Sequence, residues 1–485
     1  MNKRNNCLLC HDAACTRECG VMEPDKILRS LYFENKDVVI NELSEKIACT
    51  DCDGRCEGKC PIHFNIRDTI LSLPINDGEK VEIDYDILKT DFCGIPLENP
   101  FLLSSSVVAS TYDMCARAFE AGWAGAAFKT ICLMDIEEAS PRFAAIKDNE
   151  RIIGFKNIEQ LSEHSVAENI EVFKRLKKDY PHKFLLVSIM GRDEKEWAYL
   201  ASLLNEECAD ALELNFSCPN MTEDATGSDV GQIPELVEKY CRVVKENTKL
   251  PFIAKLTPNV THIEEAADAA IRGGADGVAA INTIKSLIEV ILNMKNRSYL
   301  ASIGGYSGKA VKPIALRYIA ELGKDENLQG KHISAMGGIE TWEDALEYIS
   351  LGATTVQVTT AVMEYGYRII DDLRSGAALC LMRLGCKSVK DLIGQCLDEI
   401  VPTEELDRSF VIYPRFLRQN CVGCQRCYLS CMDGGHQAIR IKDGYPVLDP
   451  EKCVGCHLCV LVCPNGAIES SRIKVPMVLS VLSTA

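Results

Sequence analysis

A short cysteine repeat near the carboxyl end constrains this 485-residue chain more than any other feature. The pattern Cys-Val-Gly-Cys-x-x-Cys-x-x-x-Cys begins at Cys421 and again at Cys453. Such short spacings bring several thiolates together around one inorganic cluster. The repeat therefore predicts a domain that carries two [4Fe–4S] clusters. Zinc is the less favoured alternative, because zinc modules rarely use three closely spaced cysteines twice over.

The order of these cysteines also predicts how the ligands are shared. In two-cluster ferredoxins the fourth cysteine of each run ligates the cluster of the other run. One cluster is therefore expected on Cys421, Cys424, Cys427 and Cys463, and the other on Cys453, Cys456, Cys459 and Cys431. We assign residues 401–485 to an α+β ferredoxin domain with two [4Fe–4S] clusters.

Two further cysteine tetrads lie near the amino end, within residues 1–88. They comprise Cys7, Cys10, Cys15 and Cys19, and then Cys49, Cys52, Cys56 and Cys60. Four thiols in so short a stretch suit a compact cubane better than a zinc ribbon, whose ligand pairs stand further apart. We expect up to two more [4Fe–4S] clusters here in preference to zinc. The partition of the ligands stays open, because cysteines can be exchanged between the two tetrads.

Composition excludes several classes of protein. The chain has 25 cysteines, but disulfide frameworks belong to small secreted chains. Its net charge of −17 disfavours nucleic acid as a partner, because phosphate binding requires a clustered positive surface. No apolar run reaches the ~20 residues of a membrane span, and the first residues lack the apolar core of a secretory signal. We therefore expect a cytoplasmic protein with no membrane partner.

The middle region, residues 89–400, alternates strand patterns with helical patterns. Its eight apolar runs are mostly unbroken, which is typical of strands buried on both faces of a parallel sheet. These runs are Phe101–Ser105, Gly125–Lys129, Phe184–Ile189, Ala211–Ser217, Phe252–Thr257, Gly277–Thr283, His332–Gly337 and Thr354–Thr359. Helical patterns lie between them, at Asp113–Ala121, Glu194–Glu207, Pro234–Glu246, Ile263–Arg272 and Thr341–Ser350. This α/β alternation predicts a (β/α)8 TIM barrel with Asp91–Leu97 as a hairpin at its floor, and an open doubly wound sheet is the alternative.

Glycine spacing argues against a dinucleotide site in this sequence. No two of the 32 glycines are separated by a single residue, so the G-x-G of the dinucleotide fingerprint is absent. If a nicotinamide nucleotide supplies electrons, we expect another subunit to bind it.

Cys218 is the strongest catalytic candidate in the middle region. It follows the fourth predicted strand, within Asn215-Phe216-Ser217-Cys218-Pro219-Asn220. Barrel enzymes place their catalytic groups at this carboxyl end of the strands. The neighbouring amides and hydroxyl can orient a polar planar ligand. The loop beyond it carries Gly227 and Gly231 and can close over a site.

This strand end, together with Phe252–Asn259 and Ala335–Ile339, resembles the FMN barrel of the dihydroorotate and dihydropyrimidine dehydrogenase family. The segments Phe119–Trp123 and Asn157-Ile158-Glu159, with the double ferredoxin, increase the similarity to the dihydropyrimidine dehydrogenases. The first cysteine run also resembles the iron–sulfur entry region of their single-chain form, whose FAD and NADPH domains have no counterpart in this sequence. The resemblance implies the pyrimidine-reducing subunit of a hetero-oligomer whose partner flavoprotein binds FAD and NAD(P)H.

The resemblance also implies roles for individual residues. Lys129 and Lys255 would face the flavin ring, and the FMN phosphate would sit on backbone N–H groups of Gly304, Gly305, Gly337, Gly338, Thr359 and Thr360. Uracil or thymine would be bound by Asn157, Glu159, Asn215, Ser217, Asn282 and Thr283. A hydride would pass from flavin N5 to C6, and Cys218 would donate the proton to C5, since a thiol of pKa ~8.5 is protonated at neutral pH. The clusters would relay electrons one at a time from the partner to the FMN.

Two other functions stay open at this point. A dihydroorotate dehydrogenase of pyrimidine biosynthesis would share the fold, the FMN and often this cysteine, which would act there as a base. A non-catalytic iron–sulfur electron-transfer scaffold would keep the clusters beside an inactive barrel. Glu159 and the fused ferredoxin favour the reduction of uracil or thymine.

Overall fold

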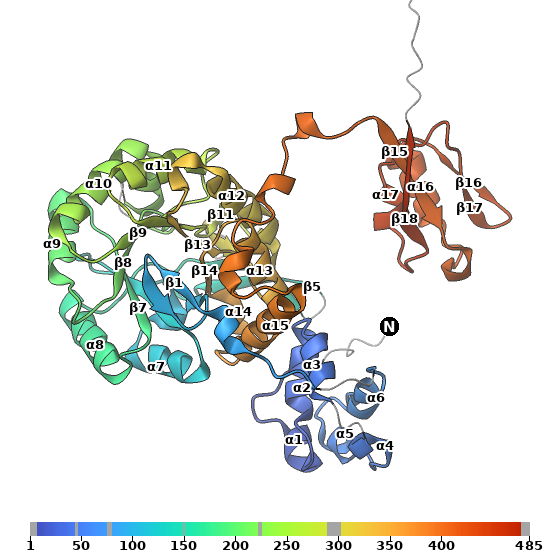
Figure 1. Ribbon diagram of the computed structural model, residues 1–485, viewed down its shortest axis with the longest axis horizontal. Helices are drawn as coiled ribbons and strands as arrows, with labels where there is room; N and C mark the ends of the chain where they lie inside the picture. Colours follow the sequence, from blue (N-terminus) through green and yellow to red (C-terminus); the bar gives the residue numbers. More distant parts are fainter. Residues whose placement is uncertain are drawn as a thin grey trace, which may run out of the picture. The chain divides into compact units, whose positions relative to one another are not determined.

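A closed barrel of eight parallel strands forms the centre of the chain (Figure 1). The computed structural model describes residues 7–43, 47–74, 80–148, 151–221, 226–288 and 302–476. The barrel strands, in chain order and in spatial order, are β3 (Phe101–Leu103), β4 (Gly125–Ile131), β7 (Phe184–Ile189), β8 (Ala211–Asn215), β9 (Phe252–Lys255), β10 (Gly277–Ala280), β13 (His332–Met336) and β14 (Thr355–Val358). Strand β14 pairs with β3 and closes the ring. The predicted TIM barrel is confirmed, and the open sheet is excluded.

Helices surround the barrel and cover its apolar strands (Figure 1). They are α7 (Tyr112–Ala121), α8 (Val166–Asp179), α9 (Glu194–Leu203), α10 (Pro234–Asn247), α11 (Ile263–Arg272), α12 (Lys312–Lys324), α13 (Trp342–Ser350), α14 (Thr360–Tyr365) and α15 (Ile369–Leu384). Side-chain caps fix several of their starts: Ser165 and Thr341 each form a capping box with the acidic residue three positions on. All five predicted helices are present, and the one expected over 194–207 ends at Leu203.

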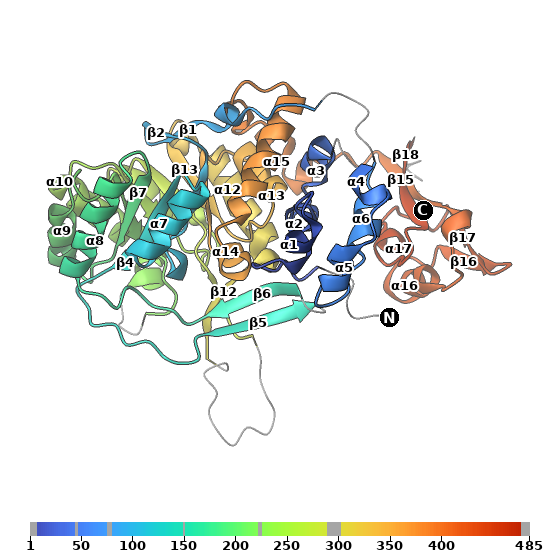
Figure 2. The same cartoon turned by 90° about the horizontal axis from the view of Figure 1, so that it is seen from below.

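The two ends of the barrel are closed differently. At the amino end of the strands lies the predicted hairpin, β1 (Thr90–Phe92) and β2 (Ile95–Leu97). Its Phe92 and Leu97 are buried in one apolar cluster with Phe184 and Ala211, the first residues of β7 and β8. Figure 2 shows a second sheet at the opposite end of the barrel. This antiparallel sheet has the order β11 (Ile284–Ser286), β12 (Gly304–Ser307), β6 (Arg151–Asn157) and β5 (Phe143–Asp148). The sequence patterns did not predict it.

The N-terminal cysteine-rich segment packs on α15 of the barrel. It consists of the short helices α1 (Ala14–Cys19), α2 (Pro24–Tyr32), α3 (Lys36–Glu42), α4 (Ile47–Thr50), α5 (Arg55–Lys59) and α6 (Ile66–Leu71). Arg29 Nε donates to Asp372 Oδ2 at 2.8 Å, and the Ser30 hydroxyl donates to the other oxygen of the same carboxylate. The chain accordingly divides into two compact units, residues 1–399 and 400–485, with this segment in the first.

The second unit is a small α+β domain built from two similar halves. Its strands pair antiparallel, β15 (Phe410–Phe416) with β18 (Ile468–Pro476) and β16 (Ile439–Lys442) with β17 (Tyr445–Leu448). Its helices, α16 (Arg426–Gly434) and α17 (Leu458–Leu461), each begin beside one cysteine run. Among the described residues of the whole chain, no helix is long and apolar enough to cross a bilayer.

Candidate active site and cysteine clusters

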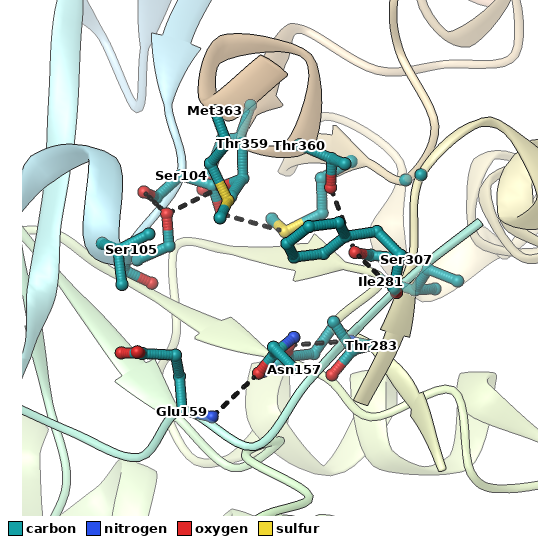
Figure 3. A pocket seen from close by; sticks show the side chains of 18 of the residues that line it. Ser104, Ser105, Asn157, Glu159, Ile281, Thr283, Ser307, Thr359, Thr360 and Met363 are labelled. Atoms are coloured by element: carbon teal, nitrogen blue, oxygen red, sulfur yellow. Dashed lines mark hydrogen bonds between the residues drawn. The ribbon is translucent and has the colours of Figure 1, made fainter. Parts of the chain in front are cut away.

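A cavity lies at the carboxyl ends of the barrel strands, between them and the second sheet. The space between its walls, including the part open to solvent, is about 1120 Å³. Asn157, Glu159 and Thr283 lie on one side of it and Ser104, Thr359 and Thr360 on the opposite side (Figure 3). The predicted residues that line it are Lys129, Asn157, Glu159, Asn215, Cys218, Lys255, Asn282, Thr283, Gly337, Gly338, Thr359 and Thr360.

Cys218 presents a protonated thiol to this cavity. Its side chain is 6% exposed, and burial raises the pKa of the thiol to about 11, with the negative charge of Glu138 acting in the same direction. The chain turns back immediately after it, because Ser228 N donates to the Cys218 carbonyl at 3.0 Å. Gly227 permits this turn: its φ is +54°, and a Cβ there would lie 2.4 Å from the same carbonyl. Residues 222–225 of this loop lie outside the described residues.

A chain of side-chain hydrogen bonds holds the amides that follow β8 and β10. Asn282 Nδ2 donates to Ser217 Oγ at 2.8 Å, and Ser217 Oγ donates to Asn215 Oδ1 at 2.8 Å. Asn215 Nδ2 in turn donates to Thr130 Oγ1 at 2.9 Å. Ser217 itself is fully buried and does not line the cavity. Its place in the structure is therefore behind the amides, which it orients.

Asn220, one of the two amides beside Cys218 in the sequence, belongs to the site although it was not among the residues expected to bind the pyrimidine. Its Nδ2 donates to Asn157 Oδ1 at 3.1 Å and to the Glu159 carbonyl at 2.8 Å, so both amide hydrogens are used. Its Oδ1 is buried and has no hydrogen-bond partner among the described residues. Since Asn220 lines the cavity, this oxygen is an acceptor available to a ligand N–H. Its position two residues after Cys218 was the available sequence signal.

The two lysines enter the cavity from strands that are three places apart in the barrel, Lys129 from β4 and Lys255 from β9, and each contacts carboxylates. Lys129 Nζ lies 2.7 Å from Glu159 Oε2 and 3.6 Å from Glu138 Oε1. Arg142 Nη1 lies 3.1 Å from the other oxygen of Glu159. Both lysine side chains are almost completely buried. The site thus presents ammonium groups that are balanced by carboxylates. An ammonium beside an anionic flavin ring would stabilise that ring.

Lys255 has a more deeply buried set of partners. Its Nζ donates to Ser105 Oγ at 2.9 Å and to Ser104 Oγ at 3.2 Å, and lies 3.4 Å from Glu213 Oε1. Sequence reasoning did not identify Glu213, because a single acidic residue within an apolar strand gives no spacing signal.

Glycines and hydroxyls form a separate part of the cavity wall, after β12, β13 and β14. Gly337 and Gly338 have φ values of +126° and +75°, and a Cβ at Gly338 would lie 2.9 Å from the Gly308 carbonyl. Ser307 Oγ and Thr360 Oγ1 lie 3.0 Å apart beside them. Close backbone approach of this kind suits a phosphate group. The acceptor Gln357 Oε1, buried and without a partner among the described residues, also fits the ring N–H of a flavin.

Gly304 and Gly305 do not belong to this wall. They lie in β12, between β11 and β6: Gly305 pairs with both strands, and Gly304 pairs with Ser286 of β11. A Cβ at Gly304 would lie 2.4 Å from the Asn157 carbonyl and one at Gly305 would lie 2.1 Å from Thr283 Oγ1. These glycines allow close strand packing, and neither lines the cavity. Ser307 and Gly308, at the end of the same strand, line it in their place.

The C-terminal cysteines gather in the two sets that the spacing predicted. One cavity of the second unit is lined by Cys421, Cys424, Cys427 and Cys463, and another by Cys431, Cys453, Cys456 and Cys459. Backbone N–H groups donate to several of these sulfurs, for example Ala467 N to Cys463 Sγ at 3.2 Å and Ala438 N to Cys431 Sγ at 3.3 Å. Hydrogen bonds to sulfur are typical of cluster sites. The donor sets therefore fit two [4Fe–4S] clusters.

The N-terminal thiols form two groups, and each group takes cysteines from both tetrads. Burial raises the pKa of Cys7, and the nearby thiols Cys10, Cys15 and Cys60 raise it further. Burial likewise raises the pKa of Cys56 to about 11, with Cys19 and Cys52 adding to it, and that of Cys49, again with Cys19 and Cys52 adding. The neighbourhoods therefore group Cys7, Cys10, Cys15 and Cys60, and separately Cys19, Cys49, Cys52 and Cys56.

Cluster ligands differ in arrangement from the ligands of one ion. Within the described ranges, no three His, Cys, Asp or Glu side chains converge as ligands of a single metal ion would. A [4Fe–4S] cluster takes four thiolates around a common space.

Comparison with known proteins matches both units. Residues 87–379 match the family model described as dihydroorotate dehydrogenase, and residues 415–470 match the model described as a 4Fe-4S dicluster domain. The NAD-dependent dihydropyrimidine dehydrogenase subunit PreA of Escherichia coli (strain K12) is 53% identical over 357 residues, which cover 73% of this chain and 87% of that protein. The catalytic subunit of dihydroorotate dehydrogenase B (NAD(+)) from Pyrococcus abyssi is 38% identical over 315 residues, covering 64% of this chain and 99% of that protein.

A solved structure supports the same fold. The crystal structure of DHODH from Eimeria tenella in complex with ferulenol matches with a TM-score of 0.54 at 19% identity. The match covers 65% of this chain and 91% of that chain.

Proposed function

The chain belongs to the family of dihydropyrimidine dehydrogenase subunits, in which a dihydroorotate dehydrogenase barrel is joined to a 4Fe-4S dicluster domain, and from this premise we propose that it reduces the 5,6 double bond of uracil or thymine. It is an oxidoreductase. The observation that carries the proposal is the protonated thiol of Cys218 in a cavity lined by amides and lysines.

Cys218 is the proton donor in this proposal. Burial keeps the thiol protonated well above neutral pH, so it can deliver a proton to C5 without prior activation. FMN, when bound, supplies the hydride that C6 receives. The product gains one hydride and one proton, and the thiolate that remains on Cys218 takes a proton back from solvent.

The amide groups would recognise the pyrimidine ring by its alternating N–H and C=O groups. Asn220 Oδ1 is free to accept from a ring N–H, and Asn157, Asn215, Asn282 and Thr283 line the same cavity. Glu159 adds a carboxylate, which accepts from a ring N–H. The lysines of this cavity, Lys129 and Lys255, each already contact a carboxylate. A neutral pyrimidine therefore fits this cavity better than orotate, whose carboxylate would need a cation of its own.

The residues present fit FMN as the resident cofactor. Lys129 and Lys255 would hold the flavin ring, since a cation beside N1 and O2 stabilises its reduced anionic form. Gly337, Gly338, Thr359 and Thr360 would hold the phosphate, with Ser307 and Gly308 taking the place expected of Gly304 and Gly305.

The cysteine-rich ends would relay electrons to the barrel. We assign one [4Fe–4S] cluster to each C-terminal thiol set and, with zinc as the alternative, one to each N-terminal group. Because the sequence has no dinucleotide fingerprint, we infer a partner flavoprotein that binds FAD and NAD(P)H in a hetero-oligomer. Iron–sulfur clusters and a cysteine-rich chain of this size are typical of a reducing compartment, so we infer the cytoplasm.

Dihydroorotate dehydrogenase activity is the second candidate, and the identity to the Pyrococcus abyssi subunit favours it. Anaerobic turnover with a reduced viologen dye distinguishes the two functions without the partner. We expect uracil and thymine to be reduced, and orotate to react at least about tenfold more slowly, because the cavity lysines are already paired with carboxylates and cannot neutralise that of orotate. Faster reduction of orotate would establish the second candidate, and no turnover of any pyrimidine by protein that retains its flavin would leave an electron-transfer scaffold.

A further inference from the structure

A buried carboxylate lies directly beneath one of the lysines of the cavity. Glu213, on β8, has no exposed surface, and its Oε1 is 3.4 Å from Lys255 Nζ. The hydroxyl of Ser105 bridges the two side chains: it accepts from Lys255 Nζ at 2.9 Å and donates to Glu213 Oε1 at 2.5 Å. The ammonium is therefore held by the carboxylate directly and through a hydroxyl.

The second oxygen of this carboxylate is also fixed. Gln357 Nε2 donates to Glu213 Oε2 at 3.3 Å and to Ser334 Oγ at 3.0 Å, so both hydrogens of the amide are used. Rotating the amide by 180° would place its oxygen against the carboxylate, which electrostatic repulsion opposes. The orientation of Gln357 is thus determined, and its Oε1 is left as an acceptor in the cavity wall.

These contacts join strands on different sides of the barrel. Below Gln357, Thr355 Oγ1 donates to Ser334 Oγ at 2.9 Å, and His332 Nε2 lies 3.0 Å from Thr355 Oγ1. Burial lowers the pKa of His332 to about 3, so this ring is neutral. A hydrogen-bonded column therefore runs through the barrel interior from β13 to the cavity floor, and Glu213 is its charged end.

Stability alone does not account for a charged pair at this depth. Replacing a buried ion pair by apolar residues is often neutral or stabilising, so its presence is weak evidence of a stabilising role. The other lysine of the cavity shows the contrast: Lys129 contacts Glu159, and Glu159 in turn contacts Arg142, which is partly open to solvent. Glu213 is fully buried and hydrogen-bonded through both oxygens, as the support of a positioned group requires.

We propose that Glu213 is a positioning residue, which holds the Lys255 ammonium at the point where it meets the flavin ring and fixes Gln357 as a neighbouring acceptor. This inference rests on the proposed function, because it requires FMN in the cavity. It assigns to Glu213 no contact with the substrate and no proton transfer. Its consequence is that most of the effect of Glu213 on the flavin passes through Lys255, and only a small remainder through Gln357.

A double-mutant cycle on the full-length chain tests this consequence, with the dissociation constant of FMN as the readout. We expect Glu213→Gln to weaken FMN binding about tenfold and Lys255→Met about thirtyfold, and the double variant to match Lys255→Met within about twofold. Glu213→Asp, which keeps the charge, should recover most of the affinity. Effects that multiply to about 300-fold in the double variant would overturn the inference.

Two further variants keep the result interpretable. Asp372→Asn removes the carboxylate of another buried ion pair, the one between α15 and Arg29, and should leave FMN affinity unchanged. If Glu213→Gln does not fold, Ser105→Ala replaces it in the cycle. This variant should weaken FMN binding about threefold in the wild-type background and not at all in the Lys255→Met background, where the ammonium is absent. An equal loss in both backgrounds would again overturn the inference, whereas a wild-type chain that binds no FMN would instead remove the proposed function.

Discussion

The barrel and the cysteine-rich parts of this chain are held together in different ways. The barrel buries Trp123, Trp197 and Tyr348 within one large apolar core, and its polar site is fixed by hydrogen bonds between its own side chains. The core of the C-terminal unit consists of Cys427, Ile439, Cys459 and Ile468. The core of the N-terminal segment likewise includes Cys49 and Cys56 beside six aliphatic residues. Cysteines of the predicted ligand sets are thus part of the apolar interior of both ends.

This difference predicts that the cysteine-rich ends need their clusters to fold, whereas the barrel folds without a cofactor. Few apolar side chains are buried in a domain this small, and metal binding then supplies much of the folding free energy. The barrel has no such need, because its cavity is formed by strand ends and glycine turns. We therefore expect loss of clusters to unfold the ends and to leave the barrel with its flavin site.

The largest effect on the barrel chemistry is expected from Cys218→Ala. Loss of the proton donor should lower dye-linked uracil reduction about 10²–10⁴-fold, while FMN and iron contents stay at the wild-type level. Cys208→Ala is the matched control, because Cys208 is a buried thiol of the barrel that does not line the cavity. Turnover by Cys218→Ala close to that of the control would remove Cys218 from the acid role.

The raised pKa of Cys218 gives this prediction a pH dependence. Since burial raises the pKa to about 11, the thiol stays protonated where an ordinary thiol of pKa ~8.5 would lose its proton. The activity that requires the protonated acid is lost only as pH rises toward the raised pKa. We expect the rate of dye-linked reduction to stay within about twofold between about pH 7 and 9. A fall centred near about pH 8.5 that is absent in Cys218→Ser would show an unshifted thiol.

The next largest effect separates the ends from the barrel. Cys459→Ser removes a buried cysteine of a predicted ligand set from the small C-terminal core, so this unit should lose iron and become sensitive to protease after residue 400. The FMN content of the barrel should not change. Cys386→Ser, outside every predicted ligand set, is the control. Loss of FMN together with iron in Cys459→Ser would contradict the independence of the two units.

A smaller effect is expected at the phosphate cradle, the part of the cavity wall formed by Gly337, Gly338, Thr359 and Thr360. Gly338→Ala strains a residue at φ +75° and brings its Cβ within 2.9 Å of the Gly308 carbonyl and 3.0 Å of Lys312 N. FMN binding should weaken about tenfold, as followed by flavin fluorescence. Gly366→Ala is the matched control, because Gly366 has a φ of +84° but open space around its Cβ position. Equal losses in both variants would show that backbone strain, and not the cradle, is responsible.

The smallest effect is expected where the N-terminal segment meets the barrel. Asp372→Asn removes the charged partner of Arg29 and weakens the hydrogen bond from Ser30. The segment should become more sensitive to limited proteolysis, while dye-linked uracil reduction stays within about twofold of wild type. A loss of activity as large as that of Cys218→Ala would show that this segment is part of the site.

Local sequence patterns predicted the parts of the molecule that they determine. Unbroken apolar runs indicated eight barrel strands, and the spacing around Cys421 and Cys453 indicated two thiol sets that each line one cavity. The strand-end position of Cys218 placed it in the cavity.

Features that depend on contacts between distant segments were missed. The sheet of β11, β12, β6 and β5 joins two insertions of the barrel, so the periodicity of neither segment predicts it. Without that sheet, Gly304 and Gly305 are wrongly expected at the phosphate site. Glu213 and Gln357 meet only when the barrel closes. The exchange of Cys19 and Cys60 between the N-terminal groups likewise follows from helix packing, which the spacing left open.

Iron, zinc and flavin content per chain, measured on anaerobically purified protein, tests the central claim most directly. A barrel with one FMN between two cluster-bearing ends predicts about sixteen irons, no zinc and one FMN, since each [4Fe–4S] takes four thiolates and the sequence offers sixteen in four sets. About eight irons with about two zincs would contradict the account of the N-terminal segment. A chain with irons but no flavin would contradict the account of the barrel.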